Sequence, residues 1–303
     1  MRLRPLLARC TTRRFTWLAL AAAAAAASAL VAPPGPARAD TIDVDLELVL
    51  AVDVSLSMDP DEQRLQRDGY VEALKDPEVI AAIRANGLAR IGVVYVEWAG
   101  TNTQQVTVPW TLIDGAETAV AYSDRLAQAP ILRAQRTSIS GALQFVGTLF
   151  ETSGFRGKRR VIDVSGDGPN NDGGPVTAIR DALVAKGITI NGLPIMLKAA
   201  TGWFDLENLD EYYEDCVIGG FASFSVPVKT KSEFARAIKR KLLLEIADRT
   251  TLPLVRIQAP GGAQSVPPAS PPLSGAREPG GRVDCLIGEK RWQQYMGGRR
   301  GTF

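Results

Sequence analysis

Between Asp40 and about Gln258 the chain alternates short apolar runs with segments of helical periodicity. Several of the apolar runs are rich in β-branched residues and have almost no polar position, which is typical of a parallel strand covered on both faces. The alternation predicts an α/β fold in which a doubly wound, mostly parallel sheet has helices on both faces. The strand candidates are Leu46–Val52, Ile91–Trp98, Gln105–Trp110, Arg160–Ser165 and Ile188–Ile195.

Helix signals separate these strand candidates. Asp59-Pro60-Asp61-Glu62 offers an N-cap, a proline at the first helical position and an acid three residues after the cap, so a helix is expected to run to about Lys75. Apolar residues recur at helical spacing in Ser138–Phe150, Pro175–Lys186 and Ser232–Ala247. In a sheet of this kind ligands bind at the carboxyl ends of the strands, so a site is expected in the loops there.

The composition excludes several kinds of chemistry. The 303 residues include no histidine, which removes Ser-His-Asp and Cys-His nucleophiles, His-ligated zinc and His proton shuttles. The formal charge is +2, but residues 1–39 hold six arginines and no acid, so the remainder of the chain is net acidic. This balance gives no reason to expect a nucleic-acid partner.

The first 39 residues have the order of a cleavable signal peptide. Basic residues come first, an apolar run from Phe15 to Ala32 follows, and Ala37-Arg38-Ala39 precedes Asp40 as a small-residue cleavage site. The alternative is an uncleaved membrane anchor, because about 18 apolar residues can just span a bilayer. We expect cleavage after Ala39, and therefore an exported protein, periplasmic or secreted, that keeps no stable membrane span.

The rest of the chain divides into three parts. Residues 40–258 form the α/β domain, residues 259–282 are a Pro/Gly-rich linker, and residues 283–303 are a short basic tail that is too small to form a core alone. Export leaves Cys216 and Cys285 as the cysteines of the mature chain, either as a disulfide or as two thiols. A disulfide would dock the tail on the domain.

Three loops hold the candidate site residues. The first strand runs into Asp53-Val54-Ser55-Leu56-Ser57, Thr137 stands just before a periodic helix, and Asp167 lies in Ser165-Gly166-Asp167-Gly168 after an apolar strand. Each loop alone is weak evidence, because Ser, Thr and Asp often do no more than cap helices and turns. Together the loops place two carboxylates and three hydroxyls at one edge of the expected sheet.

The order of these residues resembles the von Willebrand factor type A domain and its metal-ion-dependent adhesion site. The resemblance spans roughly residues 44–250. Within that superfamily, VSGDGPNN at Val164–Asn171 and DCVIGG at Asp215–Gly220 look most like a bacterial group of exported proteins described as a domain of unknown function. The resemblance implies a Rossmann-like sheet and a site that binds Mg²⁺ or Mn²⁺ and recognises a protein partner rather than turning over a substrate.

Carried over to this chain, the resemblance gives each candidate a role. Ser55 and Ser57 would ligate the metal directly, Thr137 directly or through water, and Asp53 and Asp167 mainly through water. These oxygens suit a small divalent ion, which prefers octahedral oxygen ligands and gives up water reluctantly. Because the carboxylates would act through water, the direct shell is largely neutral, and the open position attracts an anion such as a partner's Asp or Glu side chain.

Three functions are compatible with this site. The favoured one is an exported, metal-dependent module, not an enzyme, that captures an acidic side chain of a partner protein. The second is an accessory or scaffold subunit whose metal only stabilises the fold. The third is a Mg²⁺-dependent phosphohydrolase with Asp53 as its nucleophile. Such enzymes usually need a second acid two residues later, where this chain has Ser55, and no histidine can replace it.

A few other residues allow alternative interpretations. Asp163 falls inside a strand and Glu97 near the end of another, and we expect each to face an edge or to pair with an arginine, since unpaired buried acids are costly. The segment Gly168–Gly174 is either a recognition loop or a solvated one. Tyr212–Tyr213, with Trp203–Phe204 before them, are expected in the core or on a helix face rather than on a partner surface.

Overall fold

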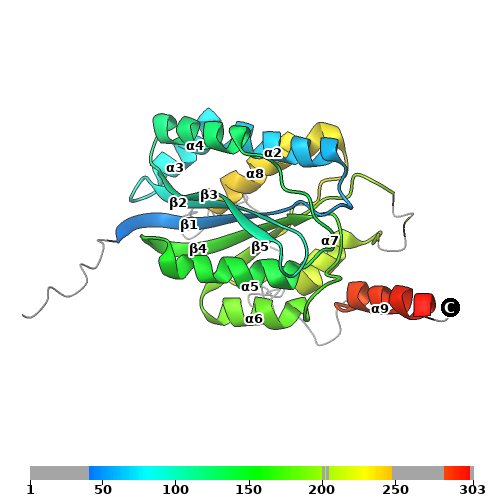
Figure 1. Ribbon diagram of the computed structural model, residues 1–303. Coiled ribbons are helices and arrows are strands. Elements are labelled where there is room, and N and C mark those ends of the chain that lie inside the picture. The colour runs from blue at the N-terminus through cyan, green and yellow to red at the C-terminus, as the bar shows by residue number, and fades with distance from the viewer. Residues whose placement is uncertain (1–40, 200–201, 203–204, 248–282, 301–303) are drawn as a thin grey trace, which may run out of the picture. The chain divides into compact units, whose positions relative to one another are not determined.

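The computed structural model of the protein describes residues 41–199, 202, 205–247 and 283–300. The expected signal peptide, residues 1–39, and the expected linker, residues 259–282, lie outside the described residues. The described part forms one sheet with the strand order β3-β2-β1-β4-β5 (Figure 1). The strands are β1 (Ile42–Asp53), β2 (Ile91–Trp98), β3 (Gln104–Ile113), β4 (Phe155–Gly166) and β5 (Ile188–Pro194).

Helices cover both faces of this sheet, with α2, α3, α4 and α8 on one face and α5, α6 and α7 on the other (Figure 1). Their bounds are α2 (Pro60–Leu74), α3 (Pro77–Ala85), α4 (Ala116–Gln128), α5 (Ile139–Leu149), α6 (Val176–Ala185), α7 (Leu209–Tyr212), α8 (Phe234–Ile246) and α9 (Ile287–Arg300). The expected α/β fold, a mostly parallel sheet with helices on both faces, is confirmed. Helices α3, α4, α7 and α9 are additions that the sequence-based assignment did not contain.

Strand β1 shows how the sequence builds two cores. It is the middle strand and pairs in parallel with both β2 and β4. Leu46, Leu48 and Leu50 point into the core under α2 and α8, whereas Val49 and Ala51 point into the core under α5 and α6. All five are fully buried. An apolar run without alternation is therefore required here, and each fully buried leucine stabilises the fold by about 1.5–3 kcal/mol.

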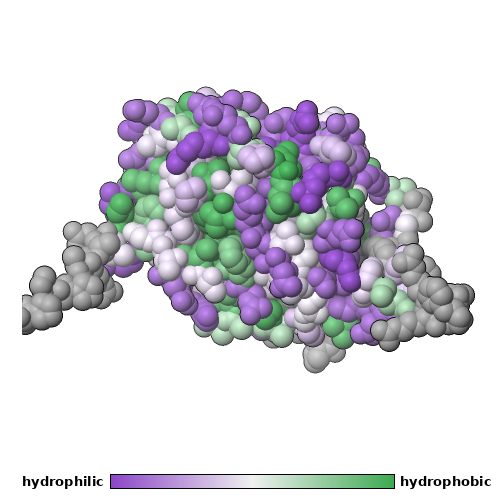
Figure 2. Space-filling model, in the orientation of Figure 1, coloured by the Kyte–Doolittle hydropathy of each residue, from purple (hydrophilic) through white to green (hydrophobic). Residues whose placement is uncertain are grey.

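Strand β3 departs from the parallel arrangement, because it follows β2 through a short loop and pairs with it antiparallel. It is an edge strand, and it contains the exposed Pro109 and faces a register shift in β2 between Val93 and Tyr95. Figure 2 shows hydrophilic side chains over most of α4 and apolar ones gathered below it, over this edge. A proline and an irregular register both hinder the pairing of an edge strand with another chain.

Asp163, in the middle of β4, is fully buried and belongs to an ionic cluster. It pairs with Lys241 of α8, and the Lys241 ammonium also lies 2.5 Å from a carboxylate oxygen of Glu245. The Tyr70 hydroxyl donates to Asp163 over 3.2 Å, and the Asn191 amide donates to Glu245 over 3.1 Å. The expectation that Asp163 faces an edge or pairs with an arginine is wrong, because a lysine from the covering helix reaches it instead.

Glu97, near the end of β2, does pair with an arginine. Its carboxylate contacts the Arg67 guanidinium of α2, and both side chains are buried. Arg67 also donates to the carbonyl oxygens of Leu126 and Ala129, and Glu97 accepts the backbone N–H of Leu132 over 2.9 Å. This network fixes the segment that follows α4 and leads to Thr137.

The pH dependence of stability tests the cluster around Lys241. Burial raises the pKa of Glu245 to about 7, although the Lys241 charge opposes the shift and Asp163 adds to it. Since an unfolded glutamate titrates near about 4.3, the folded protein holds this proton more tightly. The contribution of this proton to the free energy of unfolding is fully present below about pH 4 and is lost as pH rises through about 7. Glu245→Gln, which has no proton to lose, should therefore lose less stability than the wild type between about pH 5 and pH 8, by up to about 3 kcal/mol.

Urea unfolding of both proteins at the two pH values measures this difference. An identical pH dependence in wild type and variant would contradict the assignment of the titration to Glu245.

The C-terminal tail is tied to the domain. Cys216 and Cys285 form a disulfide across a sequence separation of 69 residues, and the expected bridge is thereby confirmed. The tail continues as α9, whose three glycines and lack of an apolar stripe gave no helix signal. Tyr212 and Tyr213 are fully buried, as the core interpretation predicted, while Trp203 and Phe204 lie outside the described residues.

Across the ranges that the structure describes, no helix combines the length and the apolar character needed to span a bilayer.

Candidate metal centre

The first part of the centre is the loop between β1 and α2. β1 ends at Asp53, and the backbone N–H of Ser55 donates to Asp53 Oδ1 over 2.7 Å, which turns the chain at once. The helix then begins with a capping box between Asp59 and Glu62. The Gln63 side chain of α2 donates to the Ser55 carbonyl oxygen over 3.1 Å. The loop is therefore short and held at both ends, so its side-chain oxygens have fixed positions.

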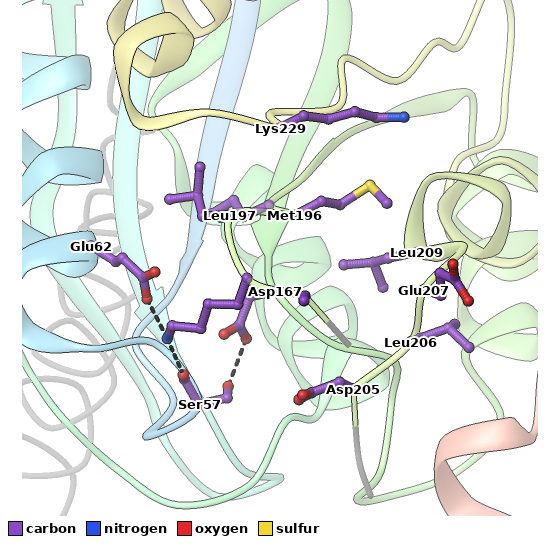
Figure 3. A pocket seen from close by; sticks show the side chains of 13 residues that line it. Ser57, Glu62, Asp167, Met196, Leu197, Asp205, Leu206, Glu207, Leu209 and Lys229 are labelled. Carbon is purple, nitrogen blue, oxygen red and sulfur yellow. Dashed lines mark hydrogen bonds and ion pairs between the residues drawn. The ribbon is translucent and has the colours of Figure 1, made fainter. Parts of the chain in front are cut away.

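Direct hydrogen bonds join this loop to the end of β4. The Ser57 hydroxyl donates to Asp167 Oδ1 over 2.6 Å (Figure 3), and the Ser55 and Ser57 hydroxyls lie 2.7 Å apart. Because the Ser57 hydrogen is used on Asp167, Ser55 must donate in the second bond. The strands β1 and β4 are parallel neighbours, so Asp53 and Asp167 leave the sheet at the same edge.

Thr137 reaches the same edge from the loop between α4 and α5. An isolated parallel bridge joins Ser55 to Ala134, and the backbone N–H of Leu56 donates to the Ala134 carbonyl over 2.9 Å. Thr137 itself is buried and lines a cavity of about 400 Å³ together with Ser55 and Ser57. The structure thus brings all five sequence-predicted residues to one place, four through a chain of hydrogen bonds and Thr137 through the shared cavity.

The two carboxylates are held in surroundings that disfavour their charge. Asp53 is fully buried, and burial and the charge of Asp167 raise its pKa well above the ordinary range despite the bond from Ser55. Burial raises the pKa of Asp167 to about 6, although the Ser57 hydroxyl and the Lys198 charge oppose the shift. Among the described side chains, Asp53 Oδ2 has no hydrogen-bond partner. Without a cation, the site therefore disfavours negative charge on both carboxyl groups.

The donor set is rich in hydroxyls rather than acids. Within the described part of the chain, no group of three or more Asp, Glu or Cys side chains gathers in a way that could hold a metal ion. The candidate set instead combines two carboxylates with the hydroxyls of two serines and one threonine. Oxygen donors of this kind are those that Mg²⁺ and Mn²⁺ prefer, and they fit neither a thiolate site nor an imidazole site.

Lys198 and Glu62 are site residues that the sequence-based reasoning missed. The Lys198 ammonium lies 2.5 Å from a carboxylate oxygen of Glu62 and donates to the Ser57 carbonyl oxygen over 3.0 Å. Both residues line a cavity of about 360 Å³ together with Ser57 and Asp167 (Figure 3). Lys198 follows the end of β5, so the rule that sites lie at the carboxyl ends of strands could have pointed to it.

The segment Gly168–Gly174 is packed rather than simply solvated. Asn170 is fully buried and accepts the backbone N–H of Ser140 over 3.0 Å. Asn171 accepts the backbone N–H of Thr137 over 3.0 Å and donates its own N–H to the Thr137 carbonyl over 2.8 Å. The loop after Asp167 therefore positions the loop of Thr137, and the solvated alternative is wrong for these residues.

A family model described as "Protein of unknown function (DUF1194)" matches residues 43–250. The chain belongs to this family. The matched residues run from β1 to just beyond α8, so DUF1194 contains all five candidate residues and ends before α9. The expected membership of a family of unknown function is confirmed. Comparison with the curated proteins gives no match.

Similar solved structures include a mussel byssus protein and a von Willebrand factor type A protein. Proximal thread matrix protein 1 from the mussel byssus, in crystal form 2, is 14% identical, with 68% of this chain and 49% of that chain covered and a TM-score of 0.50. The same mussel protein with a zinc-occupied MIDAS motif is 15% identical, with 68% and 49% covered and a TM-score of 0.47. A von Willebrand factor type A protein from Catenulispora acidiphila is 12% identical, with 67% and 43% covered and a TM-score of 0.45.

This chain spans less than half the length of each of these three proteins. At such low identities the likeness concerns the fold alone. The chain therefore shares its α/β fold with proximal thread matrix protein 1.

Proposed function

We propose that this protein is a metal-dependent protein-binding module that holds Mg²⁺ or Mn²⁺ and captures an Asp or Glu side chain of a partner protein through it. The residues proposed to hold the metal are Asp53, Ser55, Ser57, Thr137 and Asp167. The observation that supports this most strongly is the chain of bonds Asp53–Ser55–Ser57–Asp167, which joins two strand ends that are far apart in sequence. A bound dication supplies positive charge and an open position for a carboxylate.

The residues present fit such an ion. Asp53 is fully buried yet keeps one carboxylate oxygen without a partner among the described groups, and an orphaned buried oxygen costs about 1–3 kcal/mol or more when charged. Asp167 stands beside it and adds negative charge. A divalent ion would offset both carboxylates, while the hydroxyls of Ser55 and Ser57 would contact it without cancelling its charge.

The same geometry favours binding over hydrolysis. A nucleophilic carboxylate must reach the substrate, whereas Asp53 is fully buried and its Oδ1 is engaged by the Ser55 backbone. Two residues later the side chain is a hydroxyl that takes part in the Ser57 bond, so the second acid that such enzymes carry at that position is replaced by Ser55. We therefore propose a protein that is not an enzyme.

Export to the periplasm or the outside of the cell is part of the proposal. Two independent features support it. The sequence has basic, apolar and small-residue regions in order up to Ala39. The Cys216–Cys285 disulfide is a bond that persists mainly in oxidising compartments.

Partner capture in the presence and absence of metal tests the proposed function. The immobilised protein is exposed to cell-envelope extract with Mg²⁺, washed, and eluted with EDTA. We expect a specific protein in the EDTA eluate of the wild type and none in that of the double variant Ser55→Ala, Ser57→Ala, because that variant lacks both direct hydroxyl ligands. Substituting an acidic residue in the eluted protein should then abolish capture. A purely structural metal would instead lower the melting temperature on removal and leave capture unchanged.

A further inference from the structure

Helix α9 lies against the loops of the candidate metal centre, although it falls outside the matched family region. The Asn170 side chain donates to a carboxylate oxygen of Glu289 over 2.7 Å, and the Arg291 guanidinium donates to the Asp205 carbonyl over 2.6 Å. A methyl group added to Gly288 would collide with the Asn170 backbone, so helix and loop are in close contact. The disulfide at Cys285 anchors the segment just before the helix.

Arg136 and Trp292 form the contact between α9 and the Thr137 loop. The Arg136 guanidinium carbon lies 3.2 Å from the centroid of the Trp292 ring, a stacked cation–π arrangement. Arg136 has a φ of 74°, a left-handed conformation that is unfavourable for a residue with a side chain and that tends to occur at functional sites. Arg136, the residue before Thr137, therefore combines a strained backbone with a side chain stacked on Trp292.

One guanidinium nitrogen of Arg136 has no acceptor. Its Nη1 is buried and makes no hydrogen bond with any described group. The acid of the neighbouring loop, Asp172, uses Oδ2 to accept the backbone N–H and the hydroxyl of Thr101, each over 2.8 Å. A guanidinium stays charged at any ordinary pH, and the Arg136 side chain lines a cavity, so its positive charge favours an anion there.

Arg136 and the metal centre share one cavity. Arg136 and Trp292 line the cavity of about 400 Å³ that Ser55, Ser57 and Thr137 also line. Asp205 is the acid on this lining, and it accepts the backbone N–H of Gly202 over 2.7 Å. An anion bound in this cavity would therefore meet positive charge from two sources, the proposed dication and the Arg136 guanidinium.

We propose that Arg136, held by Trp292 of α9, is a second anion-binding position, so that the site selects a partner segment that carries two carboxylates. One carboxylate would go to the metal and the other to Arg136, whose planar fork matches a carboxylate in bidentate geometry. This inference rests on the proposed function of the metal centre. In this proposal α9 contributes to partner selection, because its Trp292 holds the Arg136 guanidinium in place.

Short synthetic peptides test the inference. Acetyl-Glu-(Gly)n-Glu-amide, with zero to three glycines, is compared at saturating Mg²⁺ with the matched peptides in which the second glutamate is glutamine. We expect the best-spaced two-carboxylate peptide to bind about tenfold more tightly than its matched control, as one charge-assisted bond would give. In Arg136→Gln this ratio should fall to about one. Trp292→Ala should reduce the ratio, and Trp292→Phe, which keeps an aromatic face, should retain most of it.

Two alanine substitutions on α9 test whether the position of the helix against Asn170 matters for peptide binding. Gly288→Ala forces the helix away from Asn170 and should lower the peptide ratio, whereas a methyl group at Gly297 meets nothing within 4 Å, so Gly297→Ala should leave the ratio unchanged. Equal affinity of the wild type for both peptides at every spacing would overturn the inference while leaving the metal site intact. Failure of the wild type to bind Mg²⁺ by calorimetry would remove the proposed function and the inference together.

Discussion

Asp53→Asn should strongly weaken Mg²⁺ binding and at the same time make the metal-free protein more stable. Asparagine keeps the oxygen that accepts the Ser55 N–H, and it removes a buried negative charge that stands beside Asp167. The Tyr213 hydroxyl, which like Asp53 Oδ2 has no hydrogen-bond partner among the described groups, borders the same small space above Gly166. We expect a gain on the order of 1 kcal/mol without metal and a loss of about 100-fold in Mg²⁺ affinity.

Calorimetric titration with Mg²⁺ and urea unfolding in EDTA measure the two effects of Asp53→Asn. Asp43→Asn is a matched control, because Asp43 lies at the other end of β1 in an exposed pair with Arg156. That control should leave Mg²⁺ affinity unaltered and change stability little, because an exposed ion pair contributes little. Undiminished Mg²⁺ affinity in Asp53→Asn would show that the buried carboxylate is a structural residue and not part of a metal site.

Lys241→Met should destabilise the protein by about 3–5 kcal/mol, because it removes the ammonium that lies between two buried carboxylates. Asp163 and Glu245 would then face each other without a counter-charge in the core beneath α8. The remaining bonds from Tyr70 and Asn191 are neutral and cannot replace it. Urea unfolding near neutral pH gives the difference directly.

Lys239→Met is the control on the same helix. Lys239 pairs with Asp76 and Glu78 at the surface, where solvent screens the charges, so its loss should destabilise the protein far less than the loss of Lys241. Adding Asp163→Asn and Glu245→Gln to Lys241→Met should recover much of the lost stability, since neutral partners need no cation. Equal losses in Lys241→Met and Lys239→Met would refute the idea that the buried ammonium is what neutralises these acids.

The parts of the fold that could be predicted are those with a local physical cause. The stretches Leu48–Val52 of β1 and Ile91–Val96 of β2 are without charged residues because both of their faces are covered, and α2 carries its own capping box, so each of these elements could be predicted from the sequence. α3 also has a start signal, Asp76-Pro77, but it follows the end of α2 so closely that the two helices are hard to tell apart in the sequence. The antiparallel direction of β3 depends on its pairing with β2, which no local pattern contains.

The candidate site likewise contains residues with a local sequence signal and residues that come together only in the folded chain. Asp53 and Asp167 could be predicted because each directly follows an apolar strand, and parallel neighbours end at the same edge. Lys198 and Glu62 could not, because their ion pair forms only once the end of β5 meets the start of α2. The stacking of Arg136 on Trp292 depends on the disulfide that returns α9 to the domain.

Crystals soaked with Mn²⁺ and measured at the manganese absorption edge test the central claim most directly. The account predicts an anomalous peak at the loops after β1 and β4, within about 2.0–2.2 Å of the Ser55 and Ser57 hydroxyl oxygens. No peak there, with the metal absent or bound only to scattered surface carboxylates, would contradict it.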